Sequence, residues 1–130
     1  MITLDSSLPA EIAPLSWLLG VWEGTGVVDY KVGPADAEGE HRTAEFGQRV
    51  SFSQDGGPYV HYSSTTWLLP GSDAPDGEPP VSHLAETGYW RLARPLAATD
   101  PGPGLLPGIG DRAFTTVDEV ETLRNAAGGF

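Results

Sequence analysis

The chain has 130 residues and a formal net charge of -11 at pH 7, from eighteen acidic and seven basic side chains. This length predicts a single domain with one core, and the acidic excess argues against a nucleic-acid or anionic-membrane partner, because phosphate contacts need clustered Lys or Arg. With no cysteine, the chain has no disulfide, thiolate metal site or cysteine nucleophile, whereas its seventeen glycines and twelve prolines indicate turn-rich β structure.

The N-terminal residues, M-I-T-L-D-S-S, lack the positive and apolar regions of a secretory signal. Apolar runs elsewhere are only a few residues long, whereas a membrane helix needs about 20. We therefore expect a cytoplasmic protein with no membrane partner.

A short helix followed directly by a strand is predicted over residues 15–30. Leu15, Leu18 and Leu19 recur at helical spacing, and Pro14 is suited to the first turn. Gly20 marks the change to a strand, whose alternate positions are Trp22, Gly24, Gly26, Val28 and Tyr30. Glycine at alternate positions leaves one strand face bare, which favours close approach of a backbone, a ligand or a plugging helix.

Three further strands follow. The first covers residues 43–52, which alternate between apolar and polar side chains. The second covers residues 59–69, which are rich in β-branched and aromatic side chains. The third covers residues 82–92 and follows a loop over 70–80. The sequence Gln54-Asp55-Gly56-Gly57 predicts a hairpin turn between the strands over 43–52 and 59–69. Four antiparallel strands leave two open edges, which is an incomplete barrel.

The remainder of the chain is predicted to contain a loop and a short helix. Residues 95–113 are too rich in proline and glycine for regular structure and are interpreted as an inserted loop. Thr116 and Glu119 have the spacing of a capping box, which predicts a short helix within 114–127.

Several ordered motifs resemble the nitrobindin family, a haem-binding branch related to fatty-acid-binding proteins. The motif G-x-W-x-G-x-G is complete as Gly20, Trp22, Gly24 and Gly26, after the P-L-S-x-L-L-G of residues 14–20. A second block matches at Phe46, Phe52, Thr66 and Trp67, and the A-E-T-G-Y-W-R block spans residues 85–91. The resemblance is strongest over 12–94, within one domain taken as 1–130.

This resemblance implies an all-β antiparallel barrel of the lipocalin or fatty-acid-binding type, ten-stranded in the family and incomplete here, with a short N-terminal helix. It implies a cavity for haem b and isomerisation of peroxynitrite to nitrate. The family's axial histidine lies near the C-terminus, so it is expected beyond Phe130, and no metal ligand or catalytic residue is assigned in this chain. Either the sequence is a fragment, or this member has lost the haem.

The residues proposed to line the cavity or to form the signature are Gly20, Trp22, Gly24, Gly26, Trp67, His83 and Leu84. Leu84 occupies a position where some family members have a cavity-facing histidine. Among the histidines, His41 is interpreted as a solvated loop residue and His61 as a structural one. The alternative function is a haem-free carrier of a small hydrophobic ligand, which needs only an apolar cavity and a few polar anchors; the oligomeric state is open.

Overall fold

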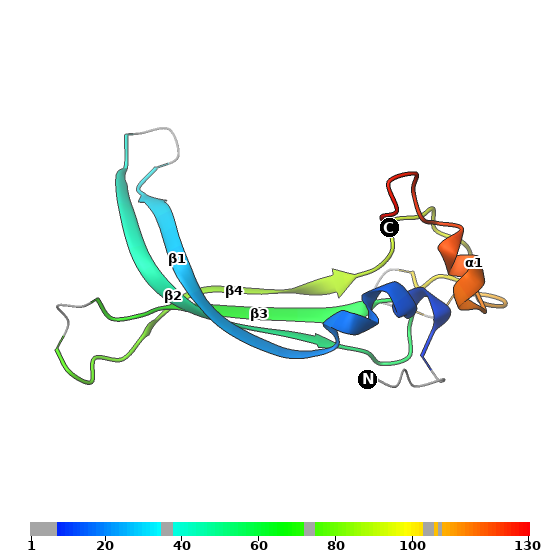
Figure 1. Cartoon of the computed structure of the whole chain (residues 1–130), viewed down its shortest axis with the longest axis horizontal. Helices are drawn as coiled ribbons and strands as arrows, with labels where there is room; N and C mark the ends of the chain where they lie inside the picture. The colour runs from blue at the N-terminus through cyan, green and yellow to red at the C-terminus, as the bar shows by residue number, and fades with distance from the viewer. Residues whose placement is uncertain (1–7, 35–37, 72–74, 103–105, 107) are drawn as a thin grey trace. The chain divides into compact units, whose positions relative to one another are not determined.

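The computed structural model describes residues 8–34, 38–71, 75–102, 106 and 108–130. Its elements in chain order are η1 (Ala10–Leu18), β1 (Gly20–Val32), β2 (Glu40–Ser53), β3 (Val60–Leu68), β4 (Val81–Trp90) and α1 (Val117–Glu121). The strands form one open antiparallel sheet in the order β1-β2-β3-β4 (Figure 1). The all-β fold with a short N-terminal helix is confirmed.

The N-terminal helix differs from its prediction in type and bounds. It is a 3-10 helix that begins at Ala10, so Pro14 lies inside it rather than in its first turn. The amide of Ile12 bonds to the carbonyl of Pro9 at 3.0 Å, the i to i+3 pattern of this helix type. Proline has no amide hydrogen, so one backbone hydrogen bond of the helix is missing at Pro14. A short 3-10 helix depends on few such bonds, and it continues past Pro14 to Leu18.

The strand bounds also differ from the sequence prediction, most at β2. This strand begins at Glu40, three residues before the predicted start, and takes in His41. The interpretation of His41 as a loop residue is therefore wrong. Its Nδ1 atom lies 3.0 Å from Oδ1 of Asp29 on β1, so pairing with the neighbouring strand extends β2 through a polar segment that local sequence marks as a loop.

The chain divides into two compact units. Unit 1 comprises Met1–Gly20, Phe52–Tyr62 and Gly88–Phe130, and unit 2 comprises Val21–Ser51 and Ser63–Thr87. All the buried large apolar residues of the described chain lie in unit 1: Ile12, Phe52, Val60, Leu92 and Val120. Within that unit α1 packs against η1. Unit 2 instead buries the hydroxyl side chains of Ser64 and Thr66.

Within the predicted loop over 95–113, the described residues form neither helix nor strand, and residues 103–105 and 107 lie outside the described part. The amide of Ile109 bonds to the carbonyl of Ala98 at 2.8 Å, which closes part of the loop on itself.

In α1 the hydroxyl of Thr116 accepts a bond from the Glu119 amide at 3.3 Å, as its capping spacing predicts. The helix ends sooner than 127, at Glu121.

Candidate functional site

One face of the sheet in unit 2 has Gly26 of β1 opposite Phe46 of β2. A Cβ atom added at Gly26 would lie 2.9 Å from Cε1 of the Phe46 ring, so the bare position accommodates an aromatic side chain. On the same face Nε2 of Gln48 donates to the Ser64 hydroxyl at 3.0 Å. We term this surface the Phe46 face. The glycine of the sequence signature is thus explained by a close approach within the chain itself.

Trp67 lies on the opposite face of the sheet. A Cβ atom at Gly47 would lie 2.5 Å from Cε2 of the Trp67 indole, so that ring covers Gly47. Because Phe46 and Gly47 are consecutive strand residues, they project to opposite faces. Gly26 and Trp67 therefore do not line one common surface, although the sequence analysis grouped them.

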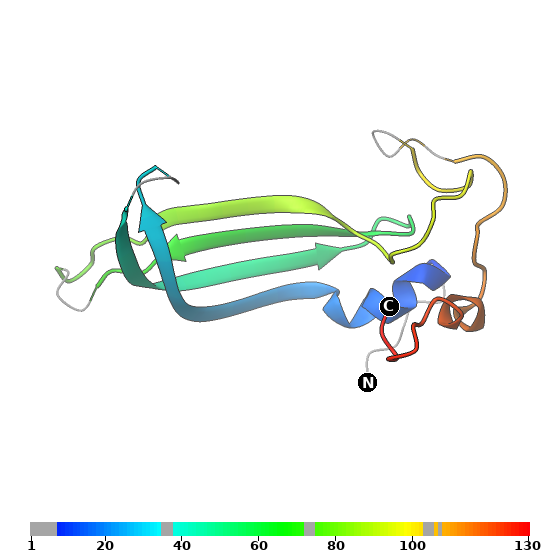
Figure 2. The same ribbon diagram turned by 90° about the horizontal axis from the view of Figure 1, so that it is seen from above.

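The sheet curls at the end of unit 2 where Tyr30 meets His83. These residues belong to β1 and β4, which are three strand spacings apart, about 14 Å in a flat sheet. Their ring centroids nevertheless lie only 5.1 Å apart. In Figure 1 the far ends of β1 and β2 bend away from β3 and β4, and Figure 2 shows the end of β1 turning across the sheet toward β4. Tyr30 shares strand alternation with Gly26, whereas His83 shares it with Tyr89, which packs beside His61 of β3. The contact therefore reports the curl of the sheet at this end.

The other signature residues are more exposed than a lined cavity would make them. Trp22 is 49% exposed and Leu84 is 58% exposed. A Cβ atom at Gly24 would meet nothing within 4 Å. Gly20 has a φ of 128°, which explains why glycine stands at the junction between η1 and β1.

Unit 1 has an aromatic cluster of its own. The ring centroid of Phe52 lies 5.3 Å from that of Tyr62 and 5.3 Å from that of Trp90, the latter in an edge-to-face arrangement. Such aromatic pairs prefer tilted or T-shaped geometries. His61 packs in the same unit beside Tyr89, with ring centroids 5.2 Å apart, and its interpretation as a structural histidine stays a prediction.

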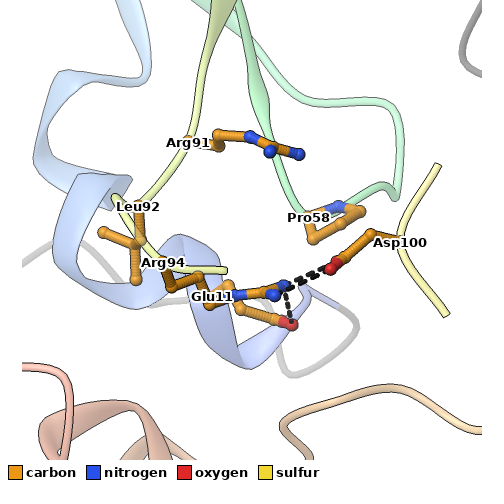
Figure 3. Close-up of a pocket in the computed structure, with 6 residues that line it drawn as sticks. All are labelled: Glu11, Pro58, Arg91, Leu92, Arg94 and Asp100. Atoms are coloured by element: carbon orange, nitrogen blue, oxygen red, sulfur yellow. Dashed lines mark hydrogen bonds and ion pairs between the residues drawn. The ribbon is translucent and has the colours of Figure 1, made fainter. Parts of the chain in front are cut away.

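A buried charged cluster of Arg94, Asp100 and Glu11 in unit 1 was not found from the sequence (Figure 3). The Arg94 guanidinium donates to both Asp100 carboxylate oxygens, at 2.7 and 2.6 Å, and its Nη2 atom lies 3.6 Å from Oε1 of Glu11. The Arg94 hydrogen bonds hold the pKa of Asp100 below its usual range, and they raise the pKa of Arg94. Glu86 and Arg91, the two charged residues of the A-E-T-G-Y-W-R block, are both exposed.

Haem requires an apolar wall and an axial donor that projects into the cavity. Phe46, whose ring covers Gly26, gives the Phe46 face the apolar character of such a wall. The three histidines of the chain are exposed, and two pockets of unit 2, lined in part by Gly26, Glu45 and Leu69, include no histidine. The described residues therefore fit the wall of a haem site, and the structure assigns none of them as the iron ligand.

Comparison with known proteins identifies a family and several relatives. A family model described as "THAP4-like, heme-binding beta-barrel domain" matches residues 11–121. Proteins named peroxynitrite isomerase are 57% identical in Clavibacter michiganensis, 55% in Clavibacter sepedonicus and 52% in Leifsonia xyli, each over 130 residues and all of this chain. The chain spans 60% of the length of each of these relatives.

Proposed function

Because the chain belongs to the family of THAP4-like, heme-binding β-barrel domains, we propose that it forms part of the wall of a haem b barrel in a protein that isomerises peroxynitrite to nitrate. The observation that carries the proposal is the family match over residues 11–121, nearly the whole chain. The name peroxynitrite isomerase, which the relatives bear, supports the reaction.

The Phe46 face is the part of the chain proposed to contact the macrocycle. The Phe46 ring, which fills the space over Gly26, offers an apolar surface for contact with a flat ligand. The haem iron would supply the isomerisation chemistry. The role of this chain is to exclude water and orient the macrocycle, and Gln48, whose amide bonds to Ser64, is a polar anchor on the same face.

Titration of the purified protein with haemin, followed in the Soret region, tests haem binding. The proposal predicts a sharp band that saturates at one equivalent. Broad absorbance that never saturates, like that of free haem, would contradict it for this chain. If the sharp band forms, His83→Ala and His61→Ala show whether either histidine is the axial donor, because loss of that donor broadens the band.

The reaction itself is tested by stopped-flow mixing of peroxynitrite with the haem-loaded protein. We expect faster decay than in buffer, with a larger share of nitrate over nitrite in the product. Unchanged decay and product ratio, despite a saturated Soret band, would refute the isomerase activity and leave haem binding intact.

A haem-free carrier of a small hydrophobic ligand is the second candidate. The observation that favours it is the exposure of all three histidines, so that no histidine among the described residues is buried as an iron ligand would be. Mass spectrometry of the protein purified without added haem distinguishes the two, because a stoichiometric copurified fatty acid supports the carrier. None of the described helices is long and apolar enough to cross a membrane, and a cytoplasmic location stays a prediction.

A further inference from the structure

Two tyrosines of unit 1 are in direct ring contact. The ring centroids of Tyr59 and Tyr89 lie 5.2 Å apart, with an angle of 87° between the ring planes. In this edge-to-face arrangement the edge of one phenol meets the face of the other. Tyr59 directly precedes β3 and Tyr89 lies near the end of β4, so the two rings meet between neighbouring strands.

Neighbouring groups hold both rings, and solvent still reaches them. A Cβ atom at Gly57 would lie 2.5 Å from Cε1 of Tyr59, so the ring of Tyr59 lies over a glycine. Tyr89 packs beside His61 as well as beside Tyr59, with ring centroids 5.2 Å apart in each pair. Tyr89 is 53% exposed and Tyr59 is half-buried. A small oxidant in solution therefore has access to the two phenols.

The Tyr59 phenol has a proton acceptor beside it. Its hydroxyl donates to Oδ2 of Asp55 at 3.5 Å, and Asp55 is exposed. Burial, followed by the charge of Asp55, raises the pKa of Tyr59, so the phenol keeps its proton at neutral pH. A phenol that loses an electron becomes strongly acidic, and the carboxylate can accept the proton that it releases. The pair thus combines ring contact, access for an oxidant and a base.

We propose that Tyr59 and Tyr89 form an oxidative modification site, at which a dityrosine cross-link joins the segment before β3 to β4. The co-reactant is a one-electron oxidant such as nitrogen dioxide, which peroxynitrous acid releases when its O–O bond breaks homolytically. Each phenol loses one electron and one proton, and two molecules of nitrogen dioxide are reduced to nitrite. The two phenoxyl radicals then join through a carbon–carbon bond ortho to their oxygens, and the hydrogens on those carbons move to the oxygens.

The cross-link is independent of haem binding. Its two phenols and the carboxylate of Asp55 all belong to unit 1, whereas the Phe46 face belongs to unit 2. The modification therefore goes beyond the proposed isomerase function, and it can be tested on the purified protein without added haem.

The test oxidises that protein with photogenerated tris(bipyridyl)ruthenium(III), a one-electron oxidant, and digests it with a protease that cuts after glutamate. Cuts after Glu78 and Glu86 leave Tyr59 and Tyr89 in different peptides. We expect dityrosine fluorescence in protein that stays monomeric on a denaturing gel, and mass spectrometry should find these two peptides joined with the loss of two hydrogen atoms. Absence of the joined peptides, or links only between separate protein molecules, would overturn the proposal.

Substitution of each tyrosine gives the second arm. Tyr59→Phe and Tyr89→Phe keep the rings and remove the hydroxyls, and we expect each to lose the dityrosine signal of the monomer. The matched control is Tyr62→Phe, which removes a phenol of the same unit whose ring packs against Phe52 and Trp90 and should leave the signal unchanged. An undiminished signal in Tyr59→Phe or Tyr89→Phe, or an equal loss in the control, would refute the assignment. If a variant does not fold, peptide mapping of the unsubstituted protein still decides.

Discussion

Removal of the Asp100 carboxylate is expected to destabilise the protein strongly. Asp100→Ala deletes two hydrogen bonds to the Arg94 guanidinium and one from the Ala97 amide at 2.7 Å. Bonds to charged groups contribute about 1.5–3 kcal/mol each, so three would sum to roughly 4.5–9 kcal/mol. Glu11 stays 3.6 Å from Arg94 and retains part of the compensation. We therefore expect a loss of about 3–5 kcal/mol in the free energy of unfolding, the usual cost of breaking a buried ion pair.

The pH dependence of the same pair gives a second readout. Since its bonds to Arg94 lower the pKa of Asp100 in the folded protein, the pair stabilises the fold above the unfolded-state pKa of about 3.9. That contribution is lost as the pH falls through the lowered folded-state pKa. The difference in unfolding free energy between the unsubstituted protein and Asp100→Asn should thus shrink below about pH 4.

Urea unfolding monitored by tryptophan fluorescence, at several pH values, measures both effects. The control is Glu121→Ala, which breaks an exposed ion pair with Arg124 and should change stability far less. A loss below about 1 kcal/mol in Asp100→Ala at pH 7, or a difference for Asp100→Asn that is constant with pH, would refute the reasoning.

Four further substitutions test the packing and the helix cap. Gly47→Ala places a Cβ atom 2.5 Å from the Trp67 ring and should lower the free energy of unfolding in urea by about 1–3 kcal/mol. Gly24→Ala, whose Cβ atom would meet nothing within 4 Å, should be neutral or slightly stabilising. Equal effects of the two substitutions would contradict the close contact of the Trp67 ring with Gly47. Phe52→Ala removes a buried ring with two aromatic neighbours at 5.3 Å, and we expect a loss of about 3–5 kcal/mol by thermal or urea unfolding. Thr116→Ala removes the N-cap of α1 and should cost about 0.5–2 kcal/mol, which calorimetry would detect; no change in Tm would argue against the cap.

The strands and their faces could be predicted because they depend on local alternation. Phe46 and Phe52 follow period two in β2, and Gly20 marks the change from helix to strand with a positive φ that favours glycine. The family motifs lie on these same strands, so sequence alone also led to the haem-binding barrel family. The extension of β2 to Glu40 was missed, since it depends on pairing with β1.

The tertiary structure decided which side chains meet. No sequence spacing places Glu11 beside Arg94 and Asp100, because their approach depends on η1 and the loop after β4 packing within one unit. The contact of Tyr30 with His83 likewise depends on the curl of the sheet, which brings distant strands together. Periodicity along the chain determined the strands and the residues available to each face, while long-range packing alone determined the buried charged cluster and the curl of the sheet.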